Sequence, residues 1–306
     1  NRTLLPTYGV AGVEIADFDN DGMLDIVFSC YGNGYAPDVE VDSYIYWGHA
    51  TNGFTVGNRT LIPTKGAWGS AAGDLDGDGF VDLVMGEYWD NNGAEVPSKV
   101  YWGTATGLDL GSPLSLSVPF PYGVQVADLN GDTKLDLVLA SYSDQASWDA
   151  TSTSRVFLFD ELTRDYPTVW SLDTIAVSAA SIGDFDNDGD LDVFLGHQRD
   201  ATGDIAGRDS YVYRNPGDGT FDDGDRFALP TAHIVTSFAA DLDLDGTTDL
   251  AVANHSDSTL DYATNSTVFW GSPTGLSAGD FTALPTEGAT GVFGAGPGIP
   301  NPRSVP

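Results

Sequence analysis

Five copies of one acidic phrase, Asp-x-Asp-x-Asp-Gly-x-x-Asp with small variations, dominate this chain of 306 residues. The copies begin at residues 17, 74, 128, 184 and 241, so successive starts lie 57, 54, 56 and 57 residues apart. A regular period of this length is the signature of a repeat architecture, in which each repeat is one supersecondary unit. The chain is therefore expected to contain one structural unit written five times.

The residues around each phrase predict four short strands per unit. A strand of small residues leads into the phrase, as in 12–16, and a short apolar run follows it, as in 24–28. An aromatic strand comes next, as in 44–48, and a turn then leads to a fourth strand, for which residues 54–56 are an example. No stretch has the sustained 3.6-residue apolar period of an amphipathic helix, so little helix is expected. Each phrase should then form the loop between the first and second strands of its unit.

Four-stranded units in series are typical of a β-propeller, whose blades leave only short, protected sheet edges. We therefore predict an all-β fold, a β-propeller of five four-stranded blades. A parallel β-helix would need a much shorter period, and a tandem of sandwich domains would need roughly 100 residues per domain. Residues 1–295 are predicted to form this single domain, and residues 296–306 an extended arm rich in Pro and Gly. Residues 143–154, rich in Ser, Thr and Asp, are expected to form an exposed loop insertion.

Each phrase places acidic or amide side chains at its positions 1, 3, 5 and 9, counted from its first Asp. Hard oxygen ligands at alternate positions of a tight loop suit calcium, and a backbone carbonyl at position 7 would add another ligand. Up to five structural Ca²⁺ ions are therefore predicted. Their expected ligands are Asp17, Asp19, Asp21, Met23 and Asp25; Asp74, Asp76, Asp78, Phe80 and Asp82; Asp128, Asn130, Asp132, Lys134 and Asp136; Asp184, Asp186, Asp188, Asp190 and Asp192; and Asp241, Asp243, Asp245, Thr247 and Asp249.

An EF-hand is the nearest alternative, but it needs a bidentate Glu at position 12 and a following helix. Position 12 here is apolar in all five copies and lies within a predicted strand: Phe28, Met85, Leu139, Leu195 and Val252. Mg²⁺ fits less well because it prefers octahedral geometry and retained waters. Five solvated turns without metal are a further alternative, although four carboxylates within nine residues repel one another strongly unless a cation lies among them. The third copy should be the weakest site, since Asn130 replaces a carboxylate there and Thr133 replaces the turn Gly.

With their flanking strands, these loops resemble the FG-GAP or VCBS repeats of extracellular β-propellers, such as integrin α-subunit heads and secreted bacterial repeat proteins. Residues 213–221, Tyr-Arg-Asn-Pro-Gly-Asp-Gly-Thr-Phe, are similar to the aromatic-strand-and-turn half of such a repeat, and the likeness covers nearly the whole chain. The resemblance implies a propeller, calcium in the strand-to-strand loops, and adhesion or ligand binding rather than catalysis. Integrin-like heads have more repeats than the five counted here, so no integrin ligand site is carried over.

The net charge of the chain limits the classes of partner that it could bind. Lys and Arg number 12 against 45 Asp and Glu, which gives a formal net charge of −33. This charge disfavours nucleic acid, whose phosphates need clustered cations, and it disfavours anionic membrane surfaces. The chain has no apolar run of 18 residues, so membrane insertion is not predicted. The single cysteine, Cys30, supports neither a disulfide framework nor a thiolate metal site. An extracellular location is expected, because open calcium loops often fill only at about 10⁻⁴–10⁻³ M calcium.

These features favour a non-enzymatic adhesion, binding or structural module whose protein or glycan ligand stays unnamed. Two alternatives stay open. One is a carbohydrate-binding lectin that uses exposed aromatic side chains, with Trp68, Trp89, Trp148 and Trp170 as candidates because they break the repeat pattern. The other is a polysaccharide hydrolase or lyase with a carboxylate pair outside the loops. No Gly-x-Ser-x-Gly elbow occurs, and most acids belong to the loops, so an enzyme is not expected.

Sequons and chain ends complete the expectations. Four Asn-x-Ser/Thr sequons are candidate glycosylation sites: Asn1, Asn58, Asn254 and Asn265. Residues 1–7 match residues 58–64, and residues 284–295 match the run into an acidic phrase, so both ends carry surplus strand segments. Unpaired strands find partners readily. Such an end either pairs within its own chain or adds to a neighbouring copy, which would give self-association into a head-to-tail fibre.

Overall fold

The computed structural model describes residues 3–32, 41–90, 94–142, 152–198, 209–255 and 264–289. These residues form strands β1 to β22 and no helix, so the predicted all-β class is confirmed for the described part of the chain. Twenty strands make five antiparallel four-stranded sheets, and β8 and β9 make a separate two-stranded ribbon. In every sheet neighbouring strands follow one another along the chain, as expected for consecutive hairpins. In the second sheet, β10-β7-β6-β5, the ribbon is inserted between β7 and β10.

The five sheets are numbered along the chain. Sheet 1 contains β1 (Val10–Ala16), β2 (Asp25–Cys30), β3 (Ser43–Tyr46) and β4 (Arg59–Ile62). Sheet 2 contains β5 (Ala67–Gly73), β6 (Asp82–Glu87), β7 (Ser98–Tyr101) and β10 (Leu114–Leu116), with the ribbon β8 (Gly103–Thr104) and β9 (Gly107–Leu108) between the last two. Sheet 3 contains β11 (Pro121–Ala127), β12 (Asp136–Ser141), β13 (Ser152–Asp160) and β14 (Asp165–Thr174). Sheet 4 contains β15 (Val177–Gly183), β16 (Asp192–His197), β17 (Ser210–Tyr213) and β18 (Arg226–Leu229). Sheet 5 contains β19 (Ile234–Ala240), β20 (Asp249–Asn254), β21 (Asn265–Phe269) and β22 (Phe281–Pro285).

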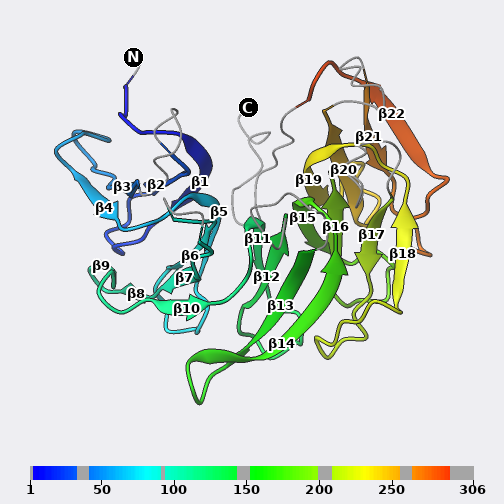
Figure 1. The fold of residues 1–306 in the computed structure, drawn as a ribbon, viewed down its shortest axis with the longest axis horizontal. Coiled ribbons are helices and arrows are strands. Elements are labelled where there is room, and N and C mark those ends of the chain that lie inside the picture. The colour runs from blue at the N-terminus through cyan, green and yellow to red at the C-terminus, as the bar shows by residue number, and fades with distance from the viewer. Residues whose placement is uncertain are drawn as a thin grey trace.

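The sheets follow one another in an arc around a common centre, as propeller blades do (Figure 1). The first strand of each sheet lies on the inner side of the arc and contacts the first strand of the next, from β1 through β5, β11 and β15 to β19. Small residues make this close approach feasible. A Cβ on Gly69 of β5, for example, would lie only 2.6 Å from the carbonyl oxygen of Tyr122 on β11.

The core lies between neighbouring sheets. Alternate residues of each second and third strand face the preceding or the following sheet, because side chains alternate across a strand. Val27 and Ile45 of sheet 1 are paired across β2 and β3, and they pack in one buried cluster with Leu83 and Tyr101 of sheet 2. Similar clusters join sheets 2 and 3, sheets 3 and 4, and sheets 4 and 5. Sheets 2, 3 and 4 are therefore buried on both faces, which explains the uninterrupted apolar runs in their second strands.

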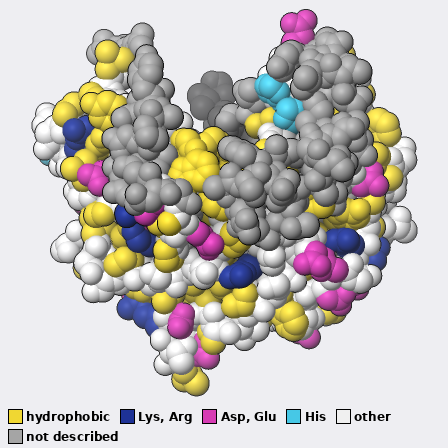
Figure 2. Space-filling view, viewed as in Figure 1, with side chains coloured by type: hydrophobic (Ala, Val, Ile, Leu, Met, Phe, Trp, Pro, Cys, Tyr) yellow, Lys and Arg dark blue, Asp and Glu magenta, His cyan; other side chains and the backbone are white. Residues whose placement is uncertain are grey.

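The two end sheets differ from the others in exposure. The residue at position 2 of the acidic phrase packs against the next sheet in the first four units and is at most 2% exposed there, whereas Leu242 in the fifth is 43% exposed. On sheet 1, Val13, Ile15 and Leu24 are 49%, 56% and 62% exposed. The space-filling view shows a notch between the two ends of the arc, with hydrophobic side chains visible at its edge (Figure 2). Sheets 1 and 5 thus each keep one face that no described sheet covers.

A repeated hydroxyl pair closes the end of four sheets. A Ser in the third strand accepts the amide of the last residue of the second strand at 3.0–3.4 Å, and its hydroxyl lies 2.7–3.0 Å from a Thr hydroxyl. We call this arrangement the Ser–Thr clasp. The pairs are Ser43 with Thr64, Ser154 with Thr174, Ser210 with Thr231, and Ser266 with Thr286. A Thr at the end of the fourth strand is thus tied to the third-strand Ser and, through it, to the end of the second strand.

Three boundary predictions need correction or lie outside the described residues. The fourth strand of the first unit is β4 (Arg59–Ile62), not residues 54–56, because the β3–β4 connection turns at Gly53 and continues to Asn58 before pairing begins. Residues 152–154 of the predicted insertion belong to β13, while residues 143–151 lie outside the described residues. The predicted arm, 296–306, and residues 290–295 before it lie outside them as well.

Candidate metal centres

The five acidic phrases form the connections between the first and second strands of the five sheets, as their spacing predicts. We number them loop 1 (17–25), loop 2 (74–82), loop 3 (128–136), loop 4 (184–192) and loop 5 (241–249). In every loop the amide at position 6 donates to the Asp at position 1, at 2.8–3.1 Å. The amide at position 7 donates to the Asp at position 5, at 2.8–3.0 Å. These local bonds fold each loop back on itself and bring its acidic side chains together.

The loop backbone is left-handed at two positions. Position 6 has φ between 75° and 101° in all five loops, which fits Gly there in four of them and places Thr133 in the conformation expected for the third. Position 4 is also left-handed, with φ between 59° and 75°. Sequence reasoning missed this second position, although Asn or Gly occupies it in four loops and both residues tolerate positive φ. The exception, Leu244, has φ of 66° and is 84% exposed.

The Asp at position 9 has a structural role that the sequence did not reveal. Its side chain is at most 1% exposed in all five units: Asp25, Asp82, Asp136, Asp192 and Asp249. One carboxylate oxygen accepts the amide at loop position 2, at 2.7–3.0 Å. The other accepts an amide from the end of the third strand or from the residues just after it, at 2.6–2.9 Å. This residue therefore fastens each loop to a segment 21–23 residues away along the chain.

Burial changes the acidity of these anchoring carboxyl groups. Desolvation is the main cause, and it raises the pKa of Asp82 and Asp192 to about 7 and that of Asp136 to about 6. The two backbone hydrogen bonds to each carboxylate oppose this shift, while neighbouring loop carboxylates add to it. Negative charge is thus concentrated where only backbone amides offset it, and a bound cation would lower the energy of the ionised form.

The geometry of four loops fits a hard cation. In loops 1, 2, 4 and 5, one oxygen from each of three Asp side chains lies within 4.8 Å of the others. The groups are Asp17, Asp19 and Asp25; Asp74, Asp76 and Asp78; Asp184, Asp186 and Asp192; and Asp241, Asp243 and Asp245. Asp74 Oδ1 and Asp186 Oδ1 are buried oxygens without a hydrogen-bond partner, which is costly unless a cation or water satisfies them. Loops 2 and 4 therefore contain acceptor atoms that the described protein groups leave unsatisfied.

Loop 3 has a different chemistry. It contributes no such three-carboxylate group within the described residues. Asn130 at position 3 turns its amide inward and donates from Nδ2 to Asp132 Oδ2 at 3.0 Å. An amide donor thus occupies one of the oxygens predicted to bind metal, which agrees in direction with the expected weakness of this site.

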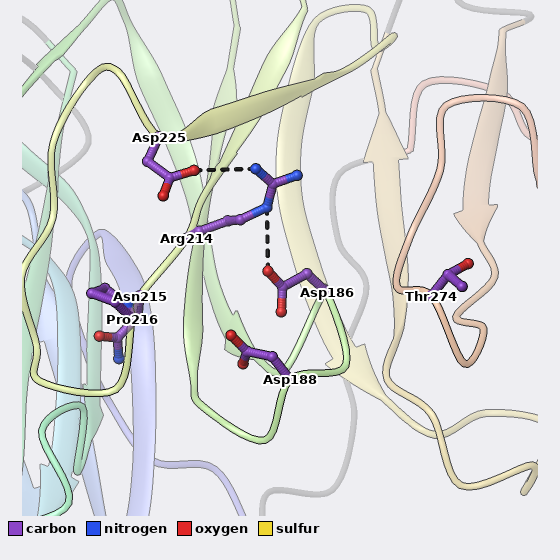
Figure 3. A pocket seen from close by; sticks show the side chains of 7 residues that line it. All are labelled: Asp186, Asp188, Arg214, Asn215, Pro216, Asp225 and Thr274. Carbon is purple, nitrogen blue, oxygen red and sulfur yellow. Dashed lines mark hydrogen bonds and ion pairs between the residues drawn. The ribbon is translucent and has the colours of Figure 1, made fainter.

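Two loops carry an arginine beside their acidic groups. Arg214 Nε lies 3.2 Å from Asp186 Oδ2 in loop 4, within a cavity of about 500 Å³ that also includes Asp188, Asn215 and Thr274 (Figure 3). Arg164 Nε lies 2.5 Å from Asp76 Oδ2 in loop 2, beside a cavity of about 310 Å³. Sequence reasoning did not single out either arginine, because neither occupies a repeated position relative to its loop.

Of the four tryptophans named as candidates for exposed binding residues, Trp68 and Trp89 pack against other rings. Trp68 stacks on Tyr122 at 4.4 Å between ring centroids, and Tyr122 stacks on Tyr142 at 4.5 Å. Trp89 meets Tyr88 edge to face at 4.6 Å. Trp170 is half-buried against the core between sheets 3 and 4, and Trp148 lies outside the described residues. The rings thus use their faces on one another, across sheets 2 and 3.

The sequons lie in unequal surroundings. Asn254 is 4% exposed and donates from Nδ2 to the carbonyl oxygen of Asn265 at 2.8 Å, so the folded chain disfavours a glycan there. Asn58 is half-buried and donates to the carbonyl oxygen of Trp47 at 3.3 Å. Asn265 is exposed, and Asn1 lies outside the described residues.

The fold of this chain has counterparts among solved structures. Similar solved structures include the V. cholerae biofilm matrix protein Bap1, with 17% identity, a TM-score of 0.49, and coverage of 88% of this chain and 38% of that one. BBS1N in complex with ARL6DN has 13% identity, a TM-score of 0.44 and 92% coverage of both chains. The PQQ domain of pyranose dehydrogenase from Coprinopsis cinerea has 11% identity, a TM-score of 0.46, and coverage of 92% and 82%. This chain therefore spans well under half the length of Bap1.

No curated protein matches the chain. In the described residues no helix is long and apolar enough to cross a membrane. The model of the FG-GAP-like repeat matches residues 17–85 and 184–252, and each match spans two acidic loops with the strands between them. The predicted resemblance to FG-GAP repeats is therefore confirmed for these two segments.

Proposed function

We propose that this chain is an extracellular, calcium-stabilised β-propeller of five blades that serves as a non-enzymatic adhesion, binding or structural module. The observation that best supports a bound metal ion is the pair of buried oxygens without hydrogen-bond partners, Asp74 Oδ1 and Asp186 Oδ1. Each belongs to a group of three converging carboxylates. Positions 1, 3, 5 and 9 of each loop, together with the carbonyl at position 7, would hold the ion. Its chemistry would be structural: a divalent charge that offsets mutual repulsion and fixes the connection between two strands.

The repeat family supports calcium over other cations. Carboxylate and carbonyl oxygens exclude soft metals, and five loops that each offer several acidic oxygens suit the larger ion better than Mg²⁺. A formal net charge of −33 also makes the metal-free chain self-repelling, so five divalent ions would bring a global as well as a local gain. Open sites of this kind belong in a calcium-rich medium, which supports the extracellular location.

Thermal unfolding tests this proposal. The chain is melted with 1 mM EDTA, with 2 mM CaCl₂ and with 2 mM MgCl₂, at a fixed ionic strength. Calcium should raise the Tm substantially above that in EDTA, and magnesium should raise it less. Equal melting temperatures in all three conditions would rule out structural calcium. Turnover of a polysaccharide panel would contradict the non-enzymatic assignment, and binding to a glycan array without turnover would favour a lectin.

Self-association is a second candidate role, and the exposure of the end sheets favours it. The face of sheet 5 that bears Leu242 corresponds to the face that packs against a following sheet in the other four units. The face of sheet 1 that bears Ile15 and Leu24 corresponds to the face that receives a preceding sheet. Between consecutive sheets of the molecule, faces of these two kinds pack against each other. Packing of sheet 5 of one copy on sheet 1 of another would therefore repeat an existing type of contact.

A further inference from the structure

The arginine beside loop 4 is held from two sides. Arg214 follows β17 directly, and its Nε lies 3.2 Å from Asp186 Oδ2 while its Nη1 lies 3.1 Å from Asp225 Oδ1. Its guanidinium also lies over the ring of Phe227, 5.1 Å from the centroid. Figure 3 shows the guanidinium of Arg214 between the carboxylates of Asp186 and Asp225, with a dashed line to each. The arginine is therefore fixed in place rather than free in solvent.

Loop 2 has an equivalent cation from a different source. Arg164 belongs to the turn between β13 and β14 of sheet 3, the sheet that follows loop 2. Its Nε lies 2.5 Å from Asp76 Oδ2 and its Nη2 lies 3.6 Å from Asp78 Oδ2. The guanidinium lies over Trp102 at 4.6 Å. Lys134 adds a second positive charge, because its Nζ donates to the carbonyl oxygen of Asp76 at 2.7 Å.

Repetition does not explain this pairing. Arg214 comes from the same unit as loop 4, whereas Arg164 comes from the unit after loop 2, yet both bind the Oδ2 atom of the position-3 Asp. The same kind of contact has thus been built from two unrelated positions. No described Lys or Arg pairs with the acids of loops 1 and 5.

The arginine is not needed to shape the loop. In loops 1, 2 and 5 the amide at position 5 donates to the position-3 Asp at 3.1–3.3 Å, whereas in loop 4 the amide of Asp188 donates to Asp184 at 3.1 Å. The left-handed backbone at positions 4 and 6 is nevertheless the same in these four loops, so loss of the arginine should leave the loop backbone unchanged. What the arginine adds is one positive charge on an oxygen next to the unsatisfied one, Asp186 Oδ1 in loop 4.

We propose that Arg214 and Arg164 are resident counter-cations that reduce the charge repulsion within loops 4 and 2 in the absence of metal and lower the affinity of these loops for calcium. Each guanidinium neutralises part of the repulsion within its loop, so the metal-free loop is less unstable. The same charge opposes a divalent ion bound to the other oxygen of the shared Asp. Loops 2 and 4 should then respond to calcium over a higher concentration range than they would without their arginines. This inference rests on the proposed calcium function.

Arg214→Gln is the test, with Arg226→Gln as the matched control. Arg226 lies in the same sheet, pairs with Asp223 at 3.0 Å and contacts no loop acid. Calcium binding to the full chain is followed by isothermal titration calorimetry, and stability in EDTA by thermal melts. Arg214→Gln should tighten one calcium site about 3- to 10-fold, since a unit charge a few ångströms from a divalent ion is removed. It should also lower the Tm in EDTA more than the Tm in saturating calcium.

Two additional variants locate the effect. Arg214→Lys keeps the charge and should retain wild-type affinity, whereas a role in holding Asp186 in position would not be rescued by the shorter contact of Lys. In a chain whose loop 4 is disabled by Asp184→Asn, Arg214→Gln should leave calcium affinity unchanged. Unchanged or weaker calcium binding by Arg214→Gln in the otherwise native chain overturns the inference. Absence of calcium binding by the wild-type chain instead overturns the proposed function.

Discussion

The buried Asp at position 9 joins its loop to the end of the third strand through hydrogen bonds from backbone amides. Asp192 accepts Phe185 N at 3.0 Å with one oxygen and Asn215 N at 2.9 Å with the other. Asp188 at position 5 of the same loop is exposed and accepts only the amide of Asp190. Replacing each Asp by Asn is therefore expected to destabilise the protein in a different way.

We predict that Asp192→Asn destabilises the fold by about 2–3 kcal/mol in EDTA, because an amide NH₂ would face a buried backbone N–H. Asp188→Asn should cost little in EDTA and should act mainly by removing stabilisation by calcium. Urea unfolding of both variants, with and without calcium, makes the comparison. Equal losses for both variants in EDTA would show that position 9 has no separate structural role.

Glu14 provides a pH-dependent contribution away from the loops. It lies on the β1 face that packs against sheet 2, accepts a hydrogen bond from Ser70 Oγ at 3.0 Å, and is largely buried. Desolvation raises the pKa of Glu14 from 4.5 to about 7, and the Ser70 bond lowers it only in part. The folded state therefore holds this proton between pH 4.5 and 7 while the unfolded state releases it, so stability falls as pH rises through that window.

Glu14→Gln should remove this penalty. We expect the variant to match the wild type near pH 4.5 and to be more stable by about 1–3 kcal/mol at pH 8, where the wild type must bury a charge. Chemical denaturation across this range measures the difference. Glu161→Gln, on the exposed β13–β14 turn, is the control and should give no such pH trend. A constant difference between Glu14→Gln and wild type at all pH values would contradict the assignment.

At the scale of the element, the Ser–Thr clasp is present in four sheets and incomplete in sheet 2. There Val118 stands where the other units have Thr, and Ser98 Oγ is a buried hydroxyl without a hydrogen-bond partner. The same end of sheet 2 instead holds an ion pair of Lys99 Nζ and Glu87 Oε1 at 2.9 Å. A local change of sequence has therefore replaced hydroxyl pairing with charge pairing.

This difference predicts opposite effects for opposite substitutions. Thr231→Val in sheet 4 leaves Ser210 without its hydroxyl partner and should cost about 1–3 kcal/mol, the usual penalty for an unsatisfied buried group. Val118→Thr in sheet 2 offers Ser98 a partner with nearly unchanged volume and should be neutral or stabilising. Thermal melts in calcium compare the two. A large loss for Val118→Thr would mean that the Lys99–Glu87 pair excludes a clasp.

At the scale of the whole molecule, the exposed faces of sheets 1 and 5 govern association. Leu24→Asp disrupts one face and Leu242→Asp the other, while Leu162→Asp changes a residue 97% exposed on neither face. If sheet 5 packs on sheet 1 of another copy, wild type and Leu162→Asp should form larger species at high concentration, and each of the other variants should stay monomeric.

Mixing the two end variants makes this prediction specific. Leu24→Asp keeps the sheet 5 face and Leu242→Asp keeps the sheet 1 face, so a mixture should give a 1:1 complex. Sedimentation velocity in calcium and moderate salt is the measurement, since salt screens repulsion between chains of net charge −33. Monomeric wild type at every concentration would mean that the two faces do not meet between copies.

Much of the fold could be predicted because it depends on local rules repeated five times. The acidic phrases locate the loops, and the left-handed backbone of position 6 follows from Gly. The fourth strand of the first unit was misplaced because strand pairing beyond a long turn is set by its partner: Tyr44 pairs with Leu61 and Tyr46 with Arg59. No local property of residues 54–56 distinguishes them from a strand.

The amino-acid sequence by itself determined the all-β class, the five units and the position of each acidic loop between two strands. These follow from side-chain period, turn residues and spacing, which act within a single unit. Only the tertiary structure decided the partners of the position-9 Asp, the arginines that pair with loops 2 and 4, and the exposure of Leu24 and Leu242. Those features depend on which surfaces meet when units stack around a centre. Identical phrases therefore have different surroundings, because sheets 1 and 5 each have one neighbouring sheet and the sheets between them have two.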